Sequence, residues 1–155
     1  MAKEDLIEIL MIEDDPDDAE LALHALQSQK IVNRIVIVED GAEALDFLFG
    51  TGQYQGRDIT NLPKIILLDL KLPKVNGLEV LERVKADERT KAIPIVILTS
   101  SNQDPDIKRA YDLGANSYIV KPVDFDQFAE TVVKLGFYWA LLNQPPIFND
   151  YESRE

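Results

Sequence analysis

The segment IEILMIEDDP, residues 7–16, contains a short apolar run, a group of carboxylates and a helix start in direct succession. Ile7–Ile12 is rich in Ile and Leu, which is typical of a buried strand. Proline is favoured at the first position of a helix, so Pro16 indicates a helix start. Further apolar runs are found at Arg34–Val38, Lys64–Leu68, Ile95–Leu98 and Ser117–Val120. Strands that alternate with helices predict a parallel sheet covered by helices on both faces.

Helix start signals follow each of these runs. The predicted helices begin at or just after Pro16 and Gly41, and at about Gly77, Asp104 and Asp124. The polar stretch of residues 51–62 is longer than most connections in such units, and its composition predicts a mobile insertion. The sequence therefore predicts a doubly wound α/β domain of five strands and five helices.

Composition limits the partners that this chain can have. Its 155 residues fit one domain, and 46% of them are hydrophobic, which is enough for a buried core. The 28 acidic and 16 basic residues leave a formal charge of -12, which repels nucleic acids and anionic lipids. The sequence has no cysteine, and no apolar run approaches the roughly 18 residues of a membrane span. We therefore expect a soluble, cytoplasmic protein that contacts neither nucleic acid nor membrane directly.

Polar side chains follow four of the five predicted strands. Glu13 and Asp14 come after the first strand, Asp69 after the third, Thr99 after the fourth and Lys121 after the fifth. The carboxyl ends of parallel strands share one edge of a doubly wound sheet, and ligands bind at that edge. We therefore expect these residues to meet in one cleft.

Carboxylates crowded at one edge repel one another unless a cation lies between them. Oxygen ligands without His or Cys select a hard ion, and Mg²⁺ fits because it binds through one or two carboxylates, a carbonyl and waters. An ionised Asp beside it can attack phosphorus to form an acyl phosphate, a transfer that needs positioning and positive charge. Mg²⁺ and the ammonium of Lys121 would supply that charge.

Five blocks of the sequence resemble the receiver domain of two-component response regulators. They are ILMIEDDP at 9–16, ILLDLKLP at 66–73, Gly77, VILTSS at 96–101 and GANSYIVKP at 114–122. The resemblance implies a flavodoxin-like sheet of strand order 2-1-3-4-5. It also implies a receiver domain over residues 1–143, with a tail over residues 144–155, and a signalling protein rather than an enzyme.

The resemblance implies a role for each residue of the predicted cleft. Asp69 would be the phosphoacceptor, and Asp14 would bind Mg²⁺ directly, together with Asp69. Glu13 would hold a metal-bound water, and the backbone carbonyl of Lys71 would complete the set of protein ligands.

Three more residues would bind the phosphoryl group or respond to it. Thr99 would donate a hydrogen bond to a phosphoryl oxygen, and Lys121 would pair with the group. Tyr118 would swing inward when Thr99 moves. The Lys121–Pro122 peptide bond would be cis, as it is in the family.

Neighbouring residues have plainer interpretations. Asp15, Asp17 and Asp18 suit a role as first-turn charges favoured by the helix dipole, which leaves them outside the site. His24, the single histidine, is expected to be an exposed helix residue rather than a phosphohistidine. A histidine phosphotransfer protein would be a helix bundle, which the strand pattern contradicts.

A finer resemblance concerns the insertion before the third strand, the segment LDLKLPK at 68–74 and a long C-terminal helix. Together they look like the single-domain regulators that partner bacterial phytochromes. The partner implied is a sensor histidine kinase, such as a bacteriophytochrome.

The last predicted helix carries more apolar surface than one contact with the sheet can cover. Three successive aromatic residues at 137–139 stand about 100° apart around its axis and cannot all face inward. Surface of this kind indicates an interface, so we predict a homodimer through this helix and the tail. The predicted interface residues are Phe137, Tyr138, Trp139, Leu142, Pro145, Ile147 and Phe148.

The sequence leaves two alternative functions open. A phosphorylation-independent adaptor would keep only the fold, but this chain retains Asp14, Asp69, Thr99 and Lys121. A phosphatase with an Asp nucleophile usually carries a second acid two residues further on, where this chain has Lys71. The favoured function is a switch that a histidine kinase phosphorylates and that signals by protein contact.

Overall fold

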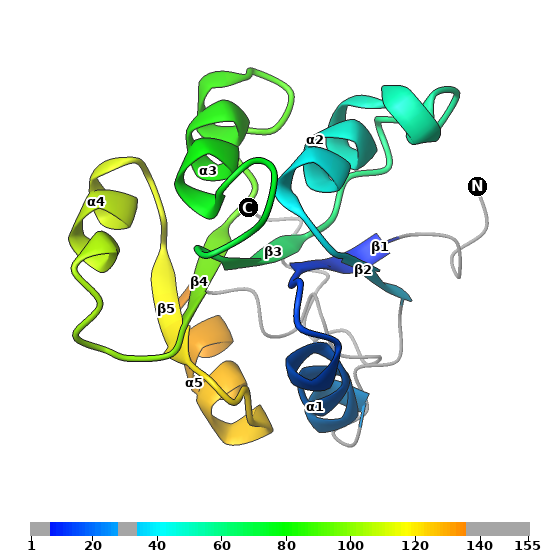
Figure 1. Cartoon of the computed structure of the whole chain (residues 1–155). Helices are drawn as coiled ribbons and strands as arrows, with labels where there is room; N and C mark the ends of the chain where they lie inside the picture. The colour runs from blue at the N-terminus through cyan, green and yellow to red at the C-terminus, as the bar shows by residue number, and fades with distance from the viewer. Residues whose placement is uncertain (1–6, 28–33, 136–155) are drawn as a thin grey trace, which may run out of the picture.

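The computed structural model describes residues 7–27 and 34–135, which form a parallel sheet between two layers of helices (Figure 1). The strands are β1 (Ile7–Ile12), β2 (Arg34–Val38), β3 (Ile65–Asp69), β4 (Ile95–Thr99) and β5 (Ser117–Val120). Their order across the sheet is β2-β1-β3-β4-β5, and each neighbouring pair is parallel. The predicted doubly wound fold and its strand order are both confirmed.

Helices cover both faces of this sheet. The bounds are α1 (Pro16–Gln27), α2 (Gly41–Phe49), α3 (Gly77–Ala86), α4 (Asp106–Asp112) and α5 (Phe125–Leu135). α1 and α5 lie on one face, and α2, α3 and α4 lie on the other (Figure 1). β3 and β4 end at Asp69 and Thr99, so these two polar residues belong to the strands instead of following them.

Alternating side chains connect the sheet to both helical layers, because successive strand residues point to opposite faces. In β1, Leu10 and Ile12 pack in the same cluster as residues of α2 and α3, whereas Ile9 and Met11 pack with residues of α1 and α5. β3 and β4 are buried along their whole length. This explains why their sequences are apolar almost throughout rather than alternating.

Side-chain caps fix the starts of α2 and α3. The Asp40 carboxylate accepts a hydrogen bond from the backbone N–H of Glu43 at 2.7 Å, and the Asn76 side chain accepts one from Glu79 at 3.0 Å. Each cap satisfies a donor that a helix N-terminus otherwise leaves unpaired.

The first residue of α3 lies directly against the end of β3. The backbone N–H of Gly77 donates to the Leu70 carbonyl at 2.9 Å. A Cβ at Gly77 would collide with the carbonyl oxygen of Asp69 and with the Leu70 backbone. The start of α3 therefore supports the backbone that carries Asp69.

The insertion between α2 and β3 packs on α2. It contains a short 3-10 helix, η2 (Gly52–Tyr54), and the Tyr54 hydroxyl donates to the Glu43 carboxylate at 2.7 Å. Arg57 donates from Nε to the Phe47 carbonyl at 2.6 Å, and its guanidinium lies 4.0 Å from the centre of the Phe47 ring. These contacts hold a segment for which composition alone predicts a mobile loop.

Several predictions concern parts of the chain outside the described residues. The proposed interface residues Phe137, Tyr138, Trp139, Leu142, Pro145, Ile147 and Phe148 are among them, as is the tail of residues 144–155. Within the described ranges, no helix is both long and apolar enough to cross a membrane.

Candidate functional site

Four strand ends bring the predicted site residues together. Asp69 and Thr99 are the last residues of β3 and β4, while Glu13 and Lys121 directly follow β1 and β5. The Glu13 N–H donates to the Val38 carbonyl at 3.0 Å, and the Lys121 N–H donates to the Thr99 carbonyl at 2.7 Å. These backbone bonds continue the sheet past the strand ends and fix the positions of both side chains.

The ammonium of Lys121 joins carboxylates from three parts of the chain. Its Nζ lies 3.0 Å from Glu13 Oε1, 3.0 Å from Asp69 Oδ2 and 3.1 Å from Asp18 Oδ2. The Lys121 side chain is 15% exposed. Its peptide bond to Pro122 is cis, as the family resemblance implies.

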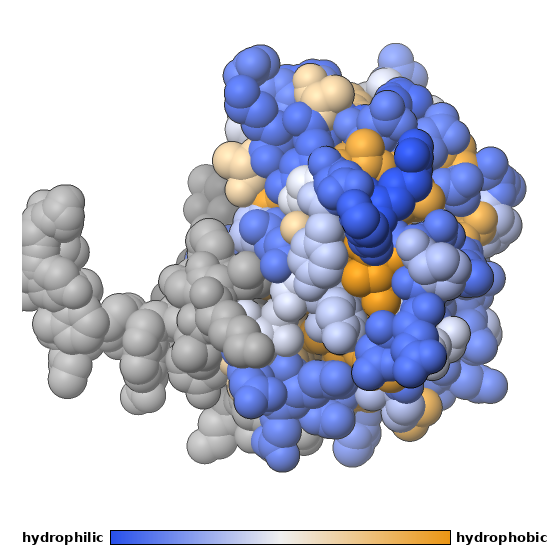
Figure 2. All heavy atoms as spheres, turned by 90° about the vertical axis from the view of Figure 1, so that its left-hand side faces the viewer, coloured by the Kyte–Doolittle hydropathy of each residue, from blue (hydrophilic) through white to orange (hydrophobic). Residues whose placement is uncertain are grey.

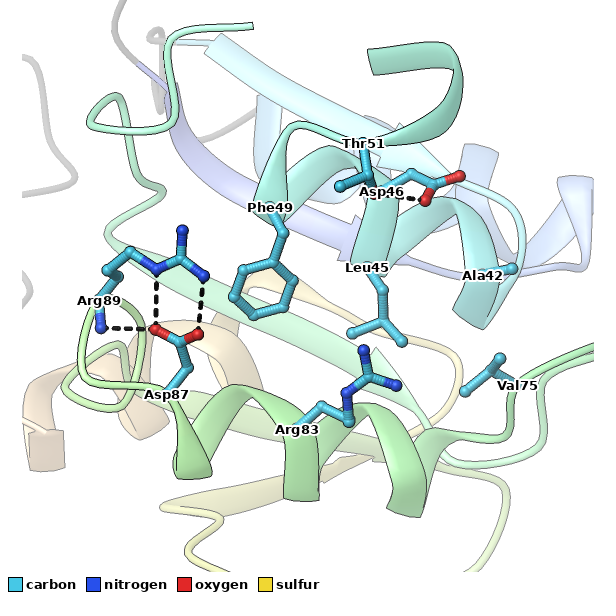
Figure 3. A pocket seen from close by; sticks show the side chains of 9 residues that line it. All are labelled: Ala42, Leu45, Asp46, Phe49, Thr51, Val75, Arg83, Asp87 and Arg89. Carbon is cyan, nitrogen blue, oxygen red and sulfur yellow. Dashed lines mark hydrogen bonds and ion pairs between the residues drawn. The ribbon is translucent and has the colours of Figure 1, made fainter. Parts of the chain in front are cut away.

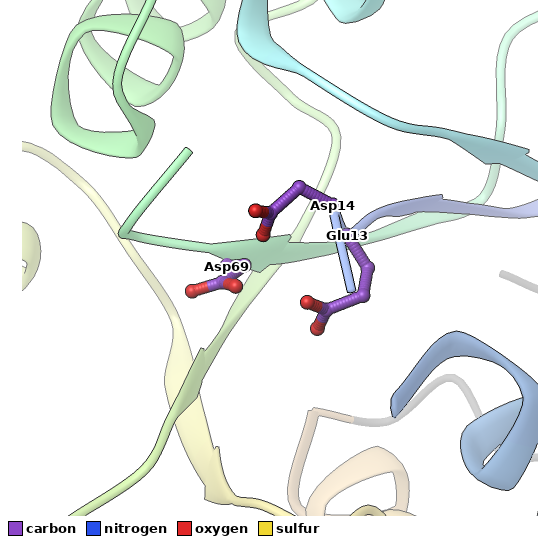
Figure 4. Close-up of side chains that lie close together, drawn as sticks. All are labelled: Glu13, Asp14 and Asp69. Atoms are coloured by element: carbon purple, nitrogen blue, oxygen red, sulfur yellow. The ribbon is translucent and has the colours of Figure 1, made fainter. Parts of the chain in front are cut away.

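Three carboxylates form an acidic cluster at this edge of the sheet. Glu13, Asp14 and Asp69 each offer one oxygen, and these oxygens lie within 4.8 Å of one another (Figure 4). Glu13 and Asp69 are buried, whereas Asp14 is exposed. The backbone N–H of Lys71 donates to Asp69 Oδ1 at 3.0 Å, which fixes that carboxylate. An oxygen-only cluster of this kind could bind a hard divalent cation.

Burial in this cluster changes the protonation of two groups. Burial raises the pKa of Glu13 from 4.5 to about 7; the hydrogen bond from Lys121 opposes the rise, and the charge of Asp69 adds to it. Burial alone would lower the pKa of Lys121, but hydrogen bonds to Glu13 and Asp69 raise it above its ordinary value. At neutral pH the lysine is therefore charged, while part of the Glu13 population is protonated.

Thr99 borders a small pocket beside Asp69. The Thr99 hydroxyl donates to the Ser101 carbonyl at 2.9 Å and lies 3.3 Å from Asp104 Oδ2. Asp104 Oδ1 accepts from the N–H of Asp106 at 2.8 Å, at the start of α4. Asp104 thus connects Thr99 to α4. The pocket has a volume of about 80 Å³ and is lined by Asp69, Leu70, Lys71, Leu98, Thr99, Ser100, Asp104 and Lys121.

Tyr118 lies on β5, half-buried, and packs towards α4 rather than into the carboxylate cluster. Its ring contacts that of Tyr111 edge to face, with centroids 6.5 Å apart. Tyr111 is 42% exposed and, with Leu21, is one of two large exposed hydrophobic side chains among the described residues. The rest of the α4 side is mostly hydrophilic (Figure 2).

Sequence reasoning missed two residues of this site. The first-turn interpretation holds for Asp17, whereas Asp15 directly precedes α1; both are exposed, and Asp15 Oδ1 accepts from the Asp17 N–H at 2.9 Å. Asp18 also lies in the first turn, but the prediction that it stays outside the site is wrong, because this turn brings its side chain back to Lys121. The short distance in sequence from the end of β1 is the one signal that could have shown this. Asp104 has no such signal, since its contact depends on the conformation of the β4–α4 loop.

A larger hollow lies between α2 and α3, away from the strand ends (Figure 3). Polar side chains on its walls pair with one another: Arg89 Nη2 lies 2.8 Å from Asp87 Oδ2, and the Thr51 hydroxyl donates to Asp46 at 2.7 Å. The acidic cluster does not contribute to its lining. The strand-end pocket therefore remains the candidate for chemistry.

Comparison with known proteins agrees with this geometry. The model of the response regulator receiver domain matches residues 9–133, which include the whole acidic cluster, Thr99 and Lys121. The chain belongs to the response regulator receiver family. As a receiver, it has its acidic cluster and its lysine at the carboxyl ends of the strands, where a doubly wound fold binds ligands.

Relatives of this receiver include regulators that span nearly the same length. The probable methanogenesis regulatory protein FilR2 of Methanothrix harundinacea is 42% identical over 143 residues, 92% of this chain and 90% of FilR2. The bacteriophytochrome response regulator AtBRR is 50% identical with a TM-score of 0.80, over 90% of this chain and 99% of AtBRR. The Mn²⁺-bound form of response regulator Rcp1 is 33% identical with a TM-score of 0.70, over 90% of this chain and 99% of Rcp1. Rcp1 comes from Synechocystis.

Proposed function

We propose that this receiver accepts a phosphoryl group on Asp69 and signals through altered contacts with other proteins. The observation that carries the proposal is the surroundings of Asp69. Its Oδ2 lies 3.0 Å from the ammonium of Lys121, and its carboxylate shares the acidic cluster with Glu13 and Asp14. A carboxylate that lies close to both a cation and candidate metal ligands suits attack on a phosphoryl group.

Asp69 would act as the nucleophile. One of its oxygens would form a bond to the phosphorus of a phosphohistidine, while the P–N bond breaks and its electron pair stays on the imidazole. The N–H of Lys71 keeps the Asp69 carboxylate in one orientation. The ammonium of Lys121, whose raised pKa keeps it charged, would stabilise the negative charge on the transferred group.

The cation that we propose for the acidic cluster is Mg²⁺. Asp14 and Asp69 would bind it directly, Glu13 through a water and Lys71 through its backbone carbonyl. When bound, Mg²⁺ would supply positive charge to the carboxylates and to the phosphoryl oxygens. The oxygen-only donor set supports this assignment, and so does the Mn²⁺-bound form of Rcp1.

The response to phosphorylation would begin at Thr99. Its hydroxyl would exchange the Ser101 carbonyl for a phosphoryl oxygen, and Tyr118 would swing inward as Thr99 moves. The hydrogen bonds that connect Thr99 through Asp104 to α4 support a change at the α4 surface. Output would then follow from a different affinity for a partner or for a second copy.

The phosphoryl donor that we propose is a sensor histidine kinase, such as a bacteriophytochrome. The likeness to AtBRR supports this class of kinase. We further propose a receiver domain over residues 1–143 and a homodimer that uses the last helix and the tail of residues 144–155. We also propose that the protein is cytoplasmic. The charge of -12 supports a protein that works without direct contact to nucleic acid or membrane.

The test is intact-protein mass spectrometry after incubation with acetyl phosphate, with and without Mg²⁺. Wild type is compared with Asp69→Asn and with Asp126→Asn, which removes an exposed carboxylate in the first turn of α5 and so matches the charge change. We expect a single Mg²⁺-dependent phosphoryl adduct that only Asp69→Asn abolishes. A wild type that stays unlabelled under conditions that label another receiver would favour the phosphorylation-independent adaptor. Steady release of phosphate from monoesters would favour the phosphatase.

A further inference from the structure

The ammonium of Lys121 has all its hydrogen-bond donors in use. A lysine ammonium carries three N–H donors and no acceptor. In the structure it donates to Glu13 Oε2 at 3.1 Å, to Asp69 Oδ2 at 3.0 Å and to Asp18 Oδ2 at 3.1 Å. A phosphoryl oxygen that pairs with Lys121 must therefore displace, or share a donor with, one of these carboxylates.

The three carboxylates differ in how easily they can release the lysine. The side chain of Glu13 is 2% exposed and that of Asp69 is 8% exposed, whereas that of Asp18 is 33% exposed. A buried carboxylate that loses its partner bears a large desolvation cost, while a partly exposed one regains water. Asp18 is therefore the partner that can be given up at the least cost.

We propose that Asp18 holds Lys121 in the unphosphorylated receiver and competes with the phosphoryl group for its ammonium, so that it slows phosphorylation. The inference rests on the proposed function of Asp69. Asp18 is thus a positioning residue that acts through Lys121 and does not contact the reacting atoms. It makes the charge of Lys121 less available and brings one more negative charge close to an anionic donor.

The chain offers a matched control in the neighbouring residue. Asp17 and Asp18 lie in the same first turn of α1, so both substitutions to Asn remove one charge that favours the helix N-terminus. Asp17 is exposed, and the ion pairs of Lys121 within the described ranges go to Glu13, Asp18 and Asp69. Asp18 is also separate from the acidic cluster, so its substitution leaves Glu13, Asp14 and Asp69 intact.

The experiment measures the initial rate of labelling by acetyl phosphate at saturating Mg²⁺, after the apparent Mg²⁺ affinity of each variant has been determined. We expect Asp18→Asn to be labelled about three- to tenfold faster than wild type, and Asp17→Asn to stay within about twofold, because a partly exposed ion pair has a modest effect. Asp18→Ala should also be labelled faster than wild type, and this variant does not introduce the amide group that Asn carries. Asp18→Glu restores a carboxylate and should return the rate towards that of wild type.

Two results would overturn the inference. One is an Asp18→Asn rate equal to or below that of wild type, and the other is an equal acceleration in Asp17→Asn, which would show a general charge effect. Both leave the proposed function intact, because wild type is still labelled on Asp69. A wild type without any phosphoryl adduct would instead refute the proposed function, so the two failures can be told apart.

Discussion

Glu13→Gln should stabilise the metal-free receiver much more at pH 8 than at pH 5. The Glu13 side chain is 2% exposed, and burial raises its pKa from 4.5 to about 7. Between these two values the native state keeps a proton that the unfolded chain has released. The free energy of unfolding therefore falls as the pH rises from about 4.5 to 7 and then levels off.

The size of this effect follows from the shift in pKa. Each unit is equivalent to about 1.4 kcal/mol, so the loss for wild type is at most about 3 to 4 kcal/mol. Gln resembles the protonated carboxyl in shape and has no charge to bury. The variant should therefore exceed wild type by up to about 3 to 4 kcal/mol at pH 8, but by less than about 1 kcal/mol near pH 5.

The assay is urea denaturation in the presence of EDTA at pH 5, 6, 7 and 8, for wild type, Glu13→Gln and Glu82→Gln. Glu82 is exposed on α3, so its variant controls for the loss of one carboxylate elsewhere. Mg²⁺ should narrow the difference at pH 8, because a ligand at 100 times its dissociation constant stabilises the native state by about 2.7 kcal/mol and wild type should bind it better. The reasoning would be refuted if, in EDTA, the free energies of unfolding of wild type and Glu13→Gln changed in parallel with pH.

Three further predictions test how the scaffold supports the site, all by urea denaturation. Gly77→Ala should cost at least about 2 kcal/mol, because the new methyl group collides with the backbone of Asp69, and it should also slow labelling by acetyl phosphate. Tyr54→Phe should cost about 1 kcal/mol, because it removes the 2.7 Å hydrogen bond to Glu43 that holds the insertion on α2. Asp40→Ala should also cost about 1 kcal/mol, because it removes the N-cap of α2.

Each of these variants has a control. Gly56→Ala places its methyl group in open space, so its cost is limited to the backbone strain of a φ of +94°, and it should lose less stability than Gly77→Ala. Tyr111→Phe removes an exposed hydroxyl and should change little, so an equal loss in both tyrosine variants would contradict the role of Tyr54. Asp40→Asn keeps the capping acceptor and should retain most of the stability, whereas a loss as large as that of the Ala variant would argue against the cap.

Most of the fold could be predicted because the strand pattern is local. β1 and β2 have the predicted bounds. β3 begins one residue later than predicted, and it ends one residue later because Asp69 completes the ladder with Leu98. The insertion of residues 51–62 was less predictable. Its composition is polar, but its packing depends on where Tyr54 and Arg57 meet α2, and those contacts are not local in sequence.

The meeting of Glu13, Asp14, Asp69, Thr99 and Lys121 at one edge was determined by the sequence alone. Parallel strands of an alternating α/β chain must all end at that edge, so residues placed at strand ends converge whatever the side-chain details. Only the tertiary structure could show that Asp18 shares the ammonium of Lys121 and that Asp104 connects Thr99 to α4. Both contacts depend on how a helix turn and a loop sit over the strand ends. That placement is set by packing across the whole sheet, which no local pattern of residues encodes.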